Sequence, residues 1–324
     1  AVLKLIDKAQ EQLHRLEAAL MEKSKEFDSV IKMGRTQLQD AVPIRLGQEF
    51  HAYASAIRRD IRRFDNAKDE IKSLNLGGTA IGTGLNADVQ YFKRVVKNMS
   101  TLTGQDLVQS YDMIDATQNL DSYASVSGIV KSCAINLSKM TNDLRLMSSG
   151  PRTGFGEINL PARQNGSSIM PGKINPVIPE VVNQVAFNII GNDMTITMAA
   201  EAGQLELNAF EPIIFYNLFQ SIETLTFAVK TLIDNCIVGI TANEEHCRRM
   251  VEESIGIITA ICPYVGYEPA SNIAKEALRT GRSVRDLILE RGLMDEEQLN
   301  TILDPYTMTE PGILGKDPMA KLRE

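Results

Sequence analysis

The sequence predicts an all-α protein, in which a long central helical bundle is followed by a small helical C-terminal domain. Apolar residues recur at helical spacing over several stretches that each exceed about 25 residues. No stretch of useful length alternates apolar and polar residues, as a half-buried strand would. With 324 residues and 44% hydrophobic content, the chain is long enough for a large core and two domains.

The first part of the chain contains two long helical patterns joined by a polar segment. The patterns cover residues 2–27 and 46–74. Residues 32–43 (KMGRTQLQDAVP) form a polar connection between them that ends at proline. The chain begins directly inside an amphipathic helix, without a capping residue or turn ahead of it. We therefore expect an N-terminal portion to precede residue 1.

A glycine-rich segment follows the second helix at residues 77–86 (GGTAIGTGLN). Its composition suggests a phosphate-binding loop, but a helix precedes it instead of a strand, and the GxGxxG and Walker spacings are both absent. We interpret it as a tight loop with closely packed backbone. A shorter helix is predicted after it, over residues 89–102.

Three long patterns then predict the centre of the bundle. In residues 115–149 and 211–240, apolar residues alternate steps of four and three, which is typical of long, nearly antiparallel helices packed at coiled-coil-like angles. Residues 177–203 are apolar or small on nearly every face, as in a helix at the middle of a bundle. Because several faces of each chain remain apolar, we expect an oligomer whose subunits share one core.

The pattern changes near residue 243. Shorter helices are predicted at residues 244–255, 270–280 and 284–290, with glycine and proline between them. We therefore expect a central bundle domain over residues 1–243 and a small helical domain over residues 244–324.

Composition excludes several classes of function. A formal charge of −7 provides no basic surface for nucleic acid or anionic membrane. No apolar run is long enough to span a membrane, and no apolar signal segment begins the chain. The four cysteines are far apart and lack CxxC spacing, so we expect reduced, structural thiols in a cytoplasmic protein.

The polar loop at residues 166–176 (GSSIMPGKINP) is the strongest candidate for chemistry. None of the three histidines lies in a polar loop beside other ligand types, which argues against a Ser-His-Asp arrangement and a metal cluster. What remains is a loop serine that acts as a base if Lys173, backbone amides and the N-terminus of the helix near Pro176 stabilise its alkoxide. A plain surface connection is the alternative, because these residue types are common in loops.

Four segments resemble the aspartase/fumarase superfamily: residues 34–43 (GRTQLQDAVP), 77–86, 142–152 (NDLRLMSSGPR) and 166–176. The resemblance extends over essentially the whole chain, and the serine-loop motif is highly specific.

Within the superfamily, residues 177–185 (VIPEVVNQV) and 198–208 (MAAEAGQLELN) are similar to the aspartase branch, and class II fumarases differ in both places. The glutamine at position 37 also favours the aspartase branch, because fumarases carry histidine at that position.

The resemblance implies a carbon–nitrogen lyase that converts L-aspartate reversibly to fumarate and ammonia without a cofactor. Ser167 would remove a proton from the β-carbon, and Ser168 would help to hold the resulting enediolate. Lys173 and Asn175 would bind the α-carboxylate, and Thr36 the other carboxylate.

Further residues would support these groups. Gln37 would face the ammonium end of the substrate, with support from Glu180. Met170 and Gly172 would belong to a lid that closes on the substrate and excludes water. The resemblance also implies a homotetramer with composite active sites, and an N-terminal domain that this sequence does not contain.

Each assignment has a structural alternative. Lys173 is also explained as a solvated loop lysine, Asn175 as a helix cap, and Glu180 as a complement to the helix dipole. Arg145 and Arg152 are interpreted as pairing residues between helices or subunits. For the whole chain, the alternatives are a class II fumarate hydratase and a catalytically silent helical assembly module.

Overall fold

The computed structural model describes residues 1–164, 166, 169–170, 172–304 and 306–312. Helices predominate among these residues, which confirms the predicted fold class. The helices are α1 (Val2–Glu26), α2 (Leu46–Glu70), α3 (Val89–Thr103), α4 (Asp115–Gln118), α5 (Asp121–Met147), α6 (Val177–Glu201), α7 (Glu211–Asn235), α8 (Glu244–Glu253), α9 (Ile258–Val265), α10 (Tyr267–Thr280), α11 (Val284–Glu290) and α12 (Glu296–Ile302).

Short strands and 3₁₀ turns connect the helices. The strands are β1 (Ile31–Thr36), β2 (Gln39–Arg45), β3 (Ser73–Leu74), β4 (Val108–Gln109), β5 (Ile158–Asn159) and β6 (Thr241–Ala242). The 3₁₀ turns are Ile237–Gly239, Ile255–Ile257 and Thr307–Thr309. β1 and β2 are antiparallel, β3 and β4 are parallel, and β5 and β6 are antiparallel.

The chain forms two compact units. Unit 1 comprises Ala1–Ala19, Ala54–Arg145 and Pro161–Val238. Unit 2 comprises Leu20–Tyr53, Leu146–Leu160 and the described residues from Gly239 onward. The expected domains over residues 1–243 and 244–324 stay a prediction.

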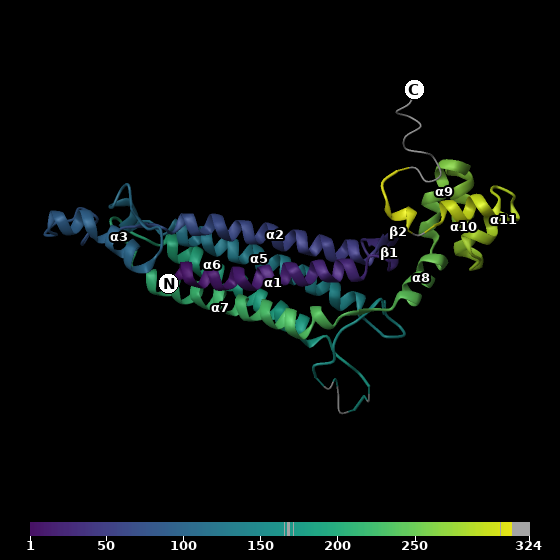
Figure 1. Cartoon of the computed structure of the whole chain (residues 1–324), viewed down its shortest axis with the longest axis horizontal. Coiled ribbons are helices and arrows are strands. Elements are labelled where there is room, and N and C mark those ends of the chain that lie inside the picture. The colour runs from purple at the N-terminus through teal and green to yellow at the C-terminus, as the bar shows by residue number, and fades with distance from the viewer. Residues whose placement is uncertain (165, 167–168, 171, 305, 313–324) are drawn as a thin grey trace, which may run out of the picture. The chain divides into compact units, whose positions relative to one another are not determined.

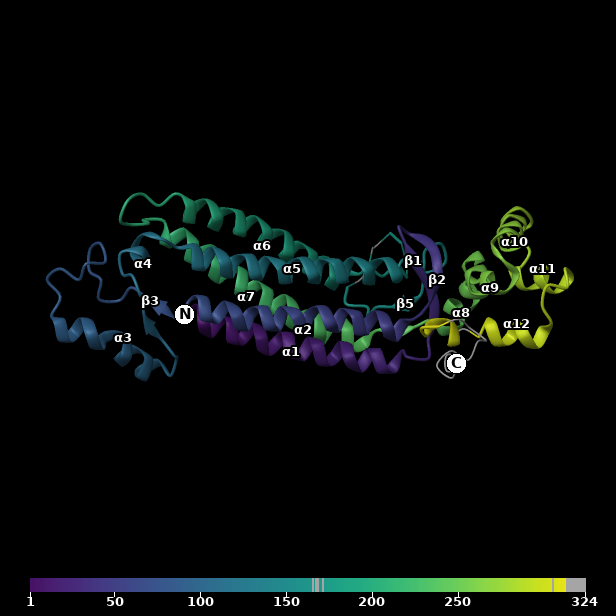
Figure 2. The ribbon, with the colours of Figure 1, turned by 90° about the horizontal axis from the view of Figure 1, so that it is seen from above.

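Unit 1 is built from α6, α7 and most of α1, α2 and α5, which run side by side in both views (Figures 1 and 2). The predicted apolar seams are the buried seams of this bundle: in α5 they run from Val126 to Leu144, and in α7 from Leu218 to Leu232. Each fully buried aliphatic side chain stabilises the fold by about 1.5–3 kcal/mol. Burial repeated along whole helices therefore makes the bundle the rigid part of unit 1.

Buried polar pairs fix how the bundle helices are aligned. Asp193 of α6 accepts hydrogen bonds from Ser127 at 2.7 Å and from Lys131 at 2.5 Å, both on α5. Asn192 of α6 donates to Ser221 of α7 at 3.1 Å. Because an unpaired polar group inside a bundle is costly, sliding one helix along its neighbour would break these pairs at a penalty.

The glycine-rich segment at residues 77–86 has the tight backbone packing predicted for it. A Cβ atom added to Gly82 would lie 2.3 Å from the carbonyl oxygen of Met113, and Gly82 has a φ of +92°. Only glycine accommodates both conditions. α3 follows, capped by the side chain of Asp88.

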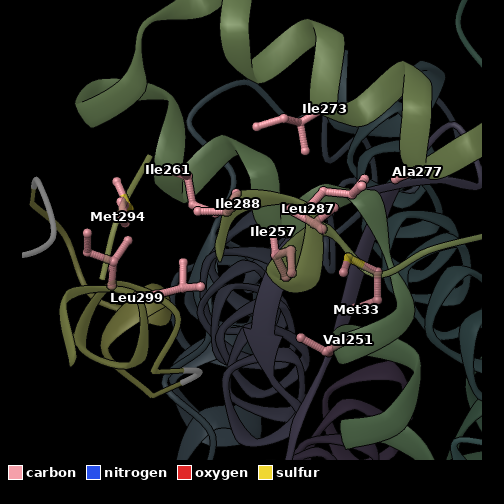
Figure 3. Close-up of a cluster of buried hydrophobic side chains, with 12 residues drawn as sticks. Met33, Val251, Ile257, Ile261, Ile273, Ala277, Leu287, Ile288, Met294 and Leu299 are labelled. Atoms are coloured by element: carbon pink, nitrogen blue, oxygen red, sulfur yellow. The ribbon is translucent and has the colours of Figure 1, made fainter. Parts of the chain in front are cut away.

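The core of unit 2 lies among the short C-terminal helices (Figure 3). Met33 of β1 is buried in the same cluster, so apolar packing attaches the β1–β2 hairpin to these helices. The other buried members of the cluster are Val251, Ile257, Ile261, Ile273, Ala277, Val284, Leu287, Ile288, Met294, Leu299 and Ile302.

The hairpin corrects one expectation. The polar connection predicted over residues 32–43 lies within the β1–β2 ladder, which pairs Ile31 with Arg45 and Thr36 with Gln39. Its register shifts between Met33 and Arg35, where Ala41 and Val42 of β2 lie opposite Gly34, so the alternation that identifies a strand in sequence is interrupted on β2.

Some helix ends also differ from the predictions. The helix expected to reach residue 74 ends at Glu70, and Ser73–Leu74 pairs with β4 instead. The pattern over residues 115–149 is divided into α4 and α5, because Asn119 adopts an extended conformation. No helix in the described part of the chain is long and apolar enough to cross a membrane.

Candidate active-site segments

The predicted site residues belong to two segments of the fold. Lys173 and Asn175 lie in the loop before α6, in unit 1. Thr36 and Gln37 lie at the tip of the β1–β2 hairpin, in unit 2. Ser167 and Ser168, the predicted catalytic residues, lie outside the described residues.

The serine loop is closed at its base by a contact between two backbone segments. A Cβ atom added to Gly166 would lie 1.9 Å from the carbonyl oxygen of Lys173, so no other residue type fits at this position without moving the backbone. The side-chain amide of Asn175 donates to the carbonyl oxygen of Gly166 at 3.3 Å. This closure brings the two ends of the loop together and leaves the Lys173 side chain exposed.

Asn175 does not cap the following helix, which was the structural alternative for this residue. Pro176 occupies the N-cap position of α6, and among the described residues no side chain makes a capping hydrogen bond there. The carbonyl oxygen of Asn175 accepts from the backbone N–H of Val177 at 2.9 Å. Asn175 thus connects the base of the loop to the first turn of α6.

Glu180 lies in that first turn, next to α5. Its carboxylate is 3.6 Å from the guanidinium of Arg145, and Arg145 also donates to Asn183 at 3.4 Å. The interpretation of Arg145 as a pairing residue between helices is confirmed. Because Glu180 and Arg145 are both partly exposed, water screens their attraction. Support of Gln37 by Glu180 stays a prediction.

Thr36 and Gln37 are exposed at the hairpin tip. Thr36 forms the last pair of the ladder with Gln39, and the turn residues Gln37 and Leu38 have φ values of 54° and 63°. Two successive left-handed residues are typical of the two-residue type I′ turn. For residues other than glycine, this conformation costs about 1 kcal/mol or more each. The turn is therefore held by the structure around it.

A buried charged group lies behind the hairpin tip. The side chain of Glu157 is 0% exposed, and that of Lys32 is 3% exposed. The Glu157 carboxylate is 2.6 Å from Nη1 of Arg35 and 3.2 Å from Nζ of Lys32. Nζ of Lys32 is also 3.1 Å from the carboxylate of Glu49. Neither Glu157 nor Lys32 was predicted from the sequence as part of a functional site. The available signal was the presence of charged residues in the polar connection at residues 32–43 and in the short segment before the serine loop.

Comparison with known proteins identifies the family. The protein-family model described as "Lyase" matches residues 1–191. The family model described as "Fumarase C C-terminus" matches residues 257–310. The aspartate ammonia-lyase of Bacillus subtilis (strain 168) is 53% identical over 321 residues, which are 99% of this chain and 68% of that protein. The chain belongs to the aspartase/fumarase family of lyases.

Other members of the aspartase/fumarase family support this relationship. An aspartate ammonia-lyase from a Bacillus species is 56% identical over 316 residues, which are 98% of this chain and 68% of that protein. Relatives from Helicobacter pylori and Pseudomonas carry the same name, and the chain spans 63–64% of their length. The chain is thus an aspartate ammonia-lyase homologue, as the aspartase-like segments predicted.

Solved structures confirm the fumarase-like fold. A fumarate lyase:delta crystallin from Brucella melitensis, bound to cobalt, has a TM-score of 0.93 and 50% identity, and the match covers 96% of this chain and 67% of that one. A recombinant class II fumarase from Schistosoma mansoni has a TM-score of 0.89 and 32% identity, and its match covers 96% and 69%.

Metal-ligand groups and cysteine thiols are the other potentially reactive features of the described residues. These residues contain no group of three or more His, Cys, Asp or Glu that could hold a metal ion. All four cysteines are free, and all except Cys262 are buried. Burial raises the pKa of the Cys236 and Cys247 thiols to about 12 and places the pKa of Cys133 well above its usual value.

These thiol environments predict selective labelling. At pH 8, a thiol whose pKa is about 12 is ionised in about one molecule in 10⁴, and burial also blocks access. We expect Ellman's reagent to modify Cys262 first in the native protein and all four cysteines after denaturation. The Cys262→Ser variant should lose the fast phase. Rapid labelling of two or more cysteines in the native protein would contradict these environments.

Proposed function

We propose that the protein is an aspartate ammonia-lyase, which converts L-aspartate reversibly to fumarate and ammonia. The observation that carries this proposal is 53–56% identity to proteins of that name over 98–99% of the chain. A class II fumarate hydratase is the second candidate, because the Schistosoma mansoni fumarase shares the fold at 32% identity.

The chemistry begins with removal of a proton from the β-carbon of L-aspartate. In the proposed mechanism Ser167 is the base, and the electron pair of the broken C–H bond moves into the β-carboxylate to give an enediolate. Ser168 and a backbone amide of the loop stabilise this intermediate. The electron pair then forms the carbon–carbon double bond as the carbon–nitrogen bond breaks, so ammonia leaves the α-carbon and fumarate remains.

A serine hydroxyl is too weak a base unless its alkoxide is stabilised. We assign this stabilisation to the Lys173 ammonium, the loop amides and the positive end of α6. The same positive field suits a dicarboxylate substrate, so Lys173 and Asn175 are assigned to the α-carboxylate. The contacts that Gly166 makes with Lys173 and Asn175 close the base of the loop. They support the proposal, because they keep Lys173 and Asn175 next to the start of α6.

The hairpin tip supplies the other substrate contacts in this proposal. Thr36 donates its hydroxyl to the β-carboxylate, and the amide oxygen of Gln37 accepts from the substrate ammonium. Both side chains are exposed at the tip, which leaves them available for a ligand. Met170 and Gly172 act as part of a lid, and the φ of +81° at Gly172 makes glycine the suitable residue there.

The exposed apolar face of α6 supports a homotetramer. Phe187 and Met194 are each 63% exposed, and further apolar residues continue the stripe at helical spacing. The stripe comprises Phe187, Ile190, Met194 and Met198. A row of large apolar side chains along a rigid helix is expected to pack against another copy of the chain. Composite active sites, with segments from different subunits, belong to the same proposal.

The activity is tested by following fumarate through its ultraviolet absorbance in the full-length protein. L-aspartate should give fumarate, and L-malate should not. Ser167→Ala should lower kcat by about 10²–10⁴-fold, because it removes the base. Ser73→Ala, which changes an exposed serine of β3, serves as the matched control. Fumarate from L-malate alone would support the hydratase, and an intact tetramer without activity on either substrate would support the silent assembly module.

The assembly is tested by a charge in the apolar stripe. Phe187→Glu should dissociate the tetramer, because packing would bury an unpaired carboxylate in the interface. Light scattering should report the smaller mass, and circular dichroism should report unchanged helix content. Glu223→Gln on α7 is the control. A Phe187→Glu protein that remains a tetramer would contradict the assignment of this stripe.

A further inference from the structure

The β1–β2 ladder contains a bulge next to two cations of β1 that reach the same carboxylate. In a regular strand, Lys32 and Arg35 would point to opposite faces, because they are three residues apart. The ladder shifts register between Met33 and Arg35, where two residues of β2 lie opposite Gly34, and both cationic side chains nevertheless reach Glu157. A Cβ atom added to Gly34 would lie 2.6 Å from the carbonyl oxygen of Val42, so the irregular backbone requires glycine at this position.

Glu157 itself is fixed on both sides of its backbone. Its N–H donates to the carbonyl oxygen of Met147 at 2.9 Å, and its carbonyl oxygen accepts from the N–H of Asn243 at 2.9 Å. The carboxylate therefore extends from an anchored position near the C-terminal end of α5 and the start of α8. The two cations on β1 bind a counter-charge whose backbone is already held in place.

The second strand of the hairpin is tied down independently. Arg35 and Asp40 are register partners, and their side chains are 3.7 Å apart. The other carboxylate oxygen of Asp40 accepts from the hydroxyl of Ser254 at 2.8 Å. Phe155 lies against Arg35, with the guanidinium carbon 4.2 Å from the ring centroid. Both strands are thus fixed immediately before the turn that carries Gln37.

We infer that Glu157 is a positioning residue, which acts through Lys32 and Arg35 to hold the hairpin turn in the conformation that presents Thr36 and Gln37. Thr36 directly follows Arg35, so fixing the guanidinium limits how far the Thr36 backbone can move. A buried charge group seldom adds net stability compared with apolar packing, whereas it specifies one arrangement of the groups around it. The part of this inference that concerns substrate rests on the proposed function.

The first test measures the hairpin without reference to activity. Glu157→Gln keeps the size of the side chain and removes the charge that holds the two cations. Hydrogen exchange of peptides from residues 31–45 should accelerate by about 10-fold, while peptides from α6 and α7 should be unchanged. Glu26→Gln is the matched control, since the exposed Glu26 forms an ion pair with Lys23 in the same unit and lies outside the hairpin. Unchanged hairpin exchange in Glu157→Gln would overturn the inference.

The second test asks whether Glu157 acts through the hairpin tip. In the full-length protein, Glu157→Gln should raise KM for L-aspartate by about 10-fold and change kcat less, because misplacement weakens substrate contacts. In the Thr36→Val background, the same change should lower kcat/KM by less than about 2-fold, because the contact that it positions is already lost. Full additivity of the two substitutions would overturn the inference.

The outcomes distinguish this inference from the proposed function. A wild-type protein that makes no fumarate from L-aspartate would reject the proposed function, and the substrate part of the inference with it. Hydrogen exchange would still decide whether Glu157 orders the hairpin. An active wild type whose Glu157→Gln variant has a loosened hairpin but normal kinetics would overturn the positioning role alone.

Discussion

Burial of apolar side chains along α1, α2, α5, α6 and α7 is the interaction on which the rest of unit 1 depends. Each buried side chain contributes a modest free energy, but the seams repeat along the helices and make them stiff. The predicted chemistry lies in a loop at the end of one of these helices. Its connection to α6 gives this loop a fixed end, and the Gly166–Lys173 contact closes its base.

Within this apolar packing, buried charged residues contribute specificity more than stability. Asp193 accepts hydrogen bonds from Ser127 and Lys131 across two helices of unit 1, and Glu157 forms ion pairs with Lys32 and Arg35 in unit 2. In both places a buried carboxylate meets donors from a separate element of the chain. Because a shift of either element would separate the buried carboxylate from its donors, each group favours one alignment of its elements over neighbouring alternatives.

The sequence predicted most of the helices because a period of 3.6 residues is a local signal, visible without knowledge of any contact. The β1–β2 hairpin could not be recognised in this way, since a bulge opposite Gly34 interrupts the alternation of β2 and the buried Lys32 of β1 is charged. The serine loop was identified through its residue types and its resemblance to a family. Glu157 has no such signal, because its importance arises from contacts with residues more than 100 positions away in the chain.

The position of α6 connects the proposed catalysis with the proposed assembly. The helix begins at Val177, immediately after the loop that contains Lys173 and Asn175, and its exposed apolar stripe extends from Phe187 to Met198. A stiff helix transmits a change at one turn to the next, so contacts along the stripe also restrain its first turn. Under the proposed function, packing between subunits therefore helps to fix the end of the serine loop. Loss of assembly should consequently reduce activity even where every substrate-binding side chain is retained.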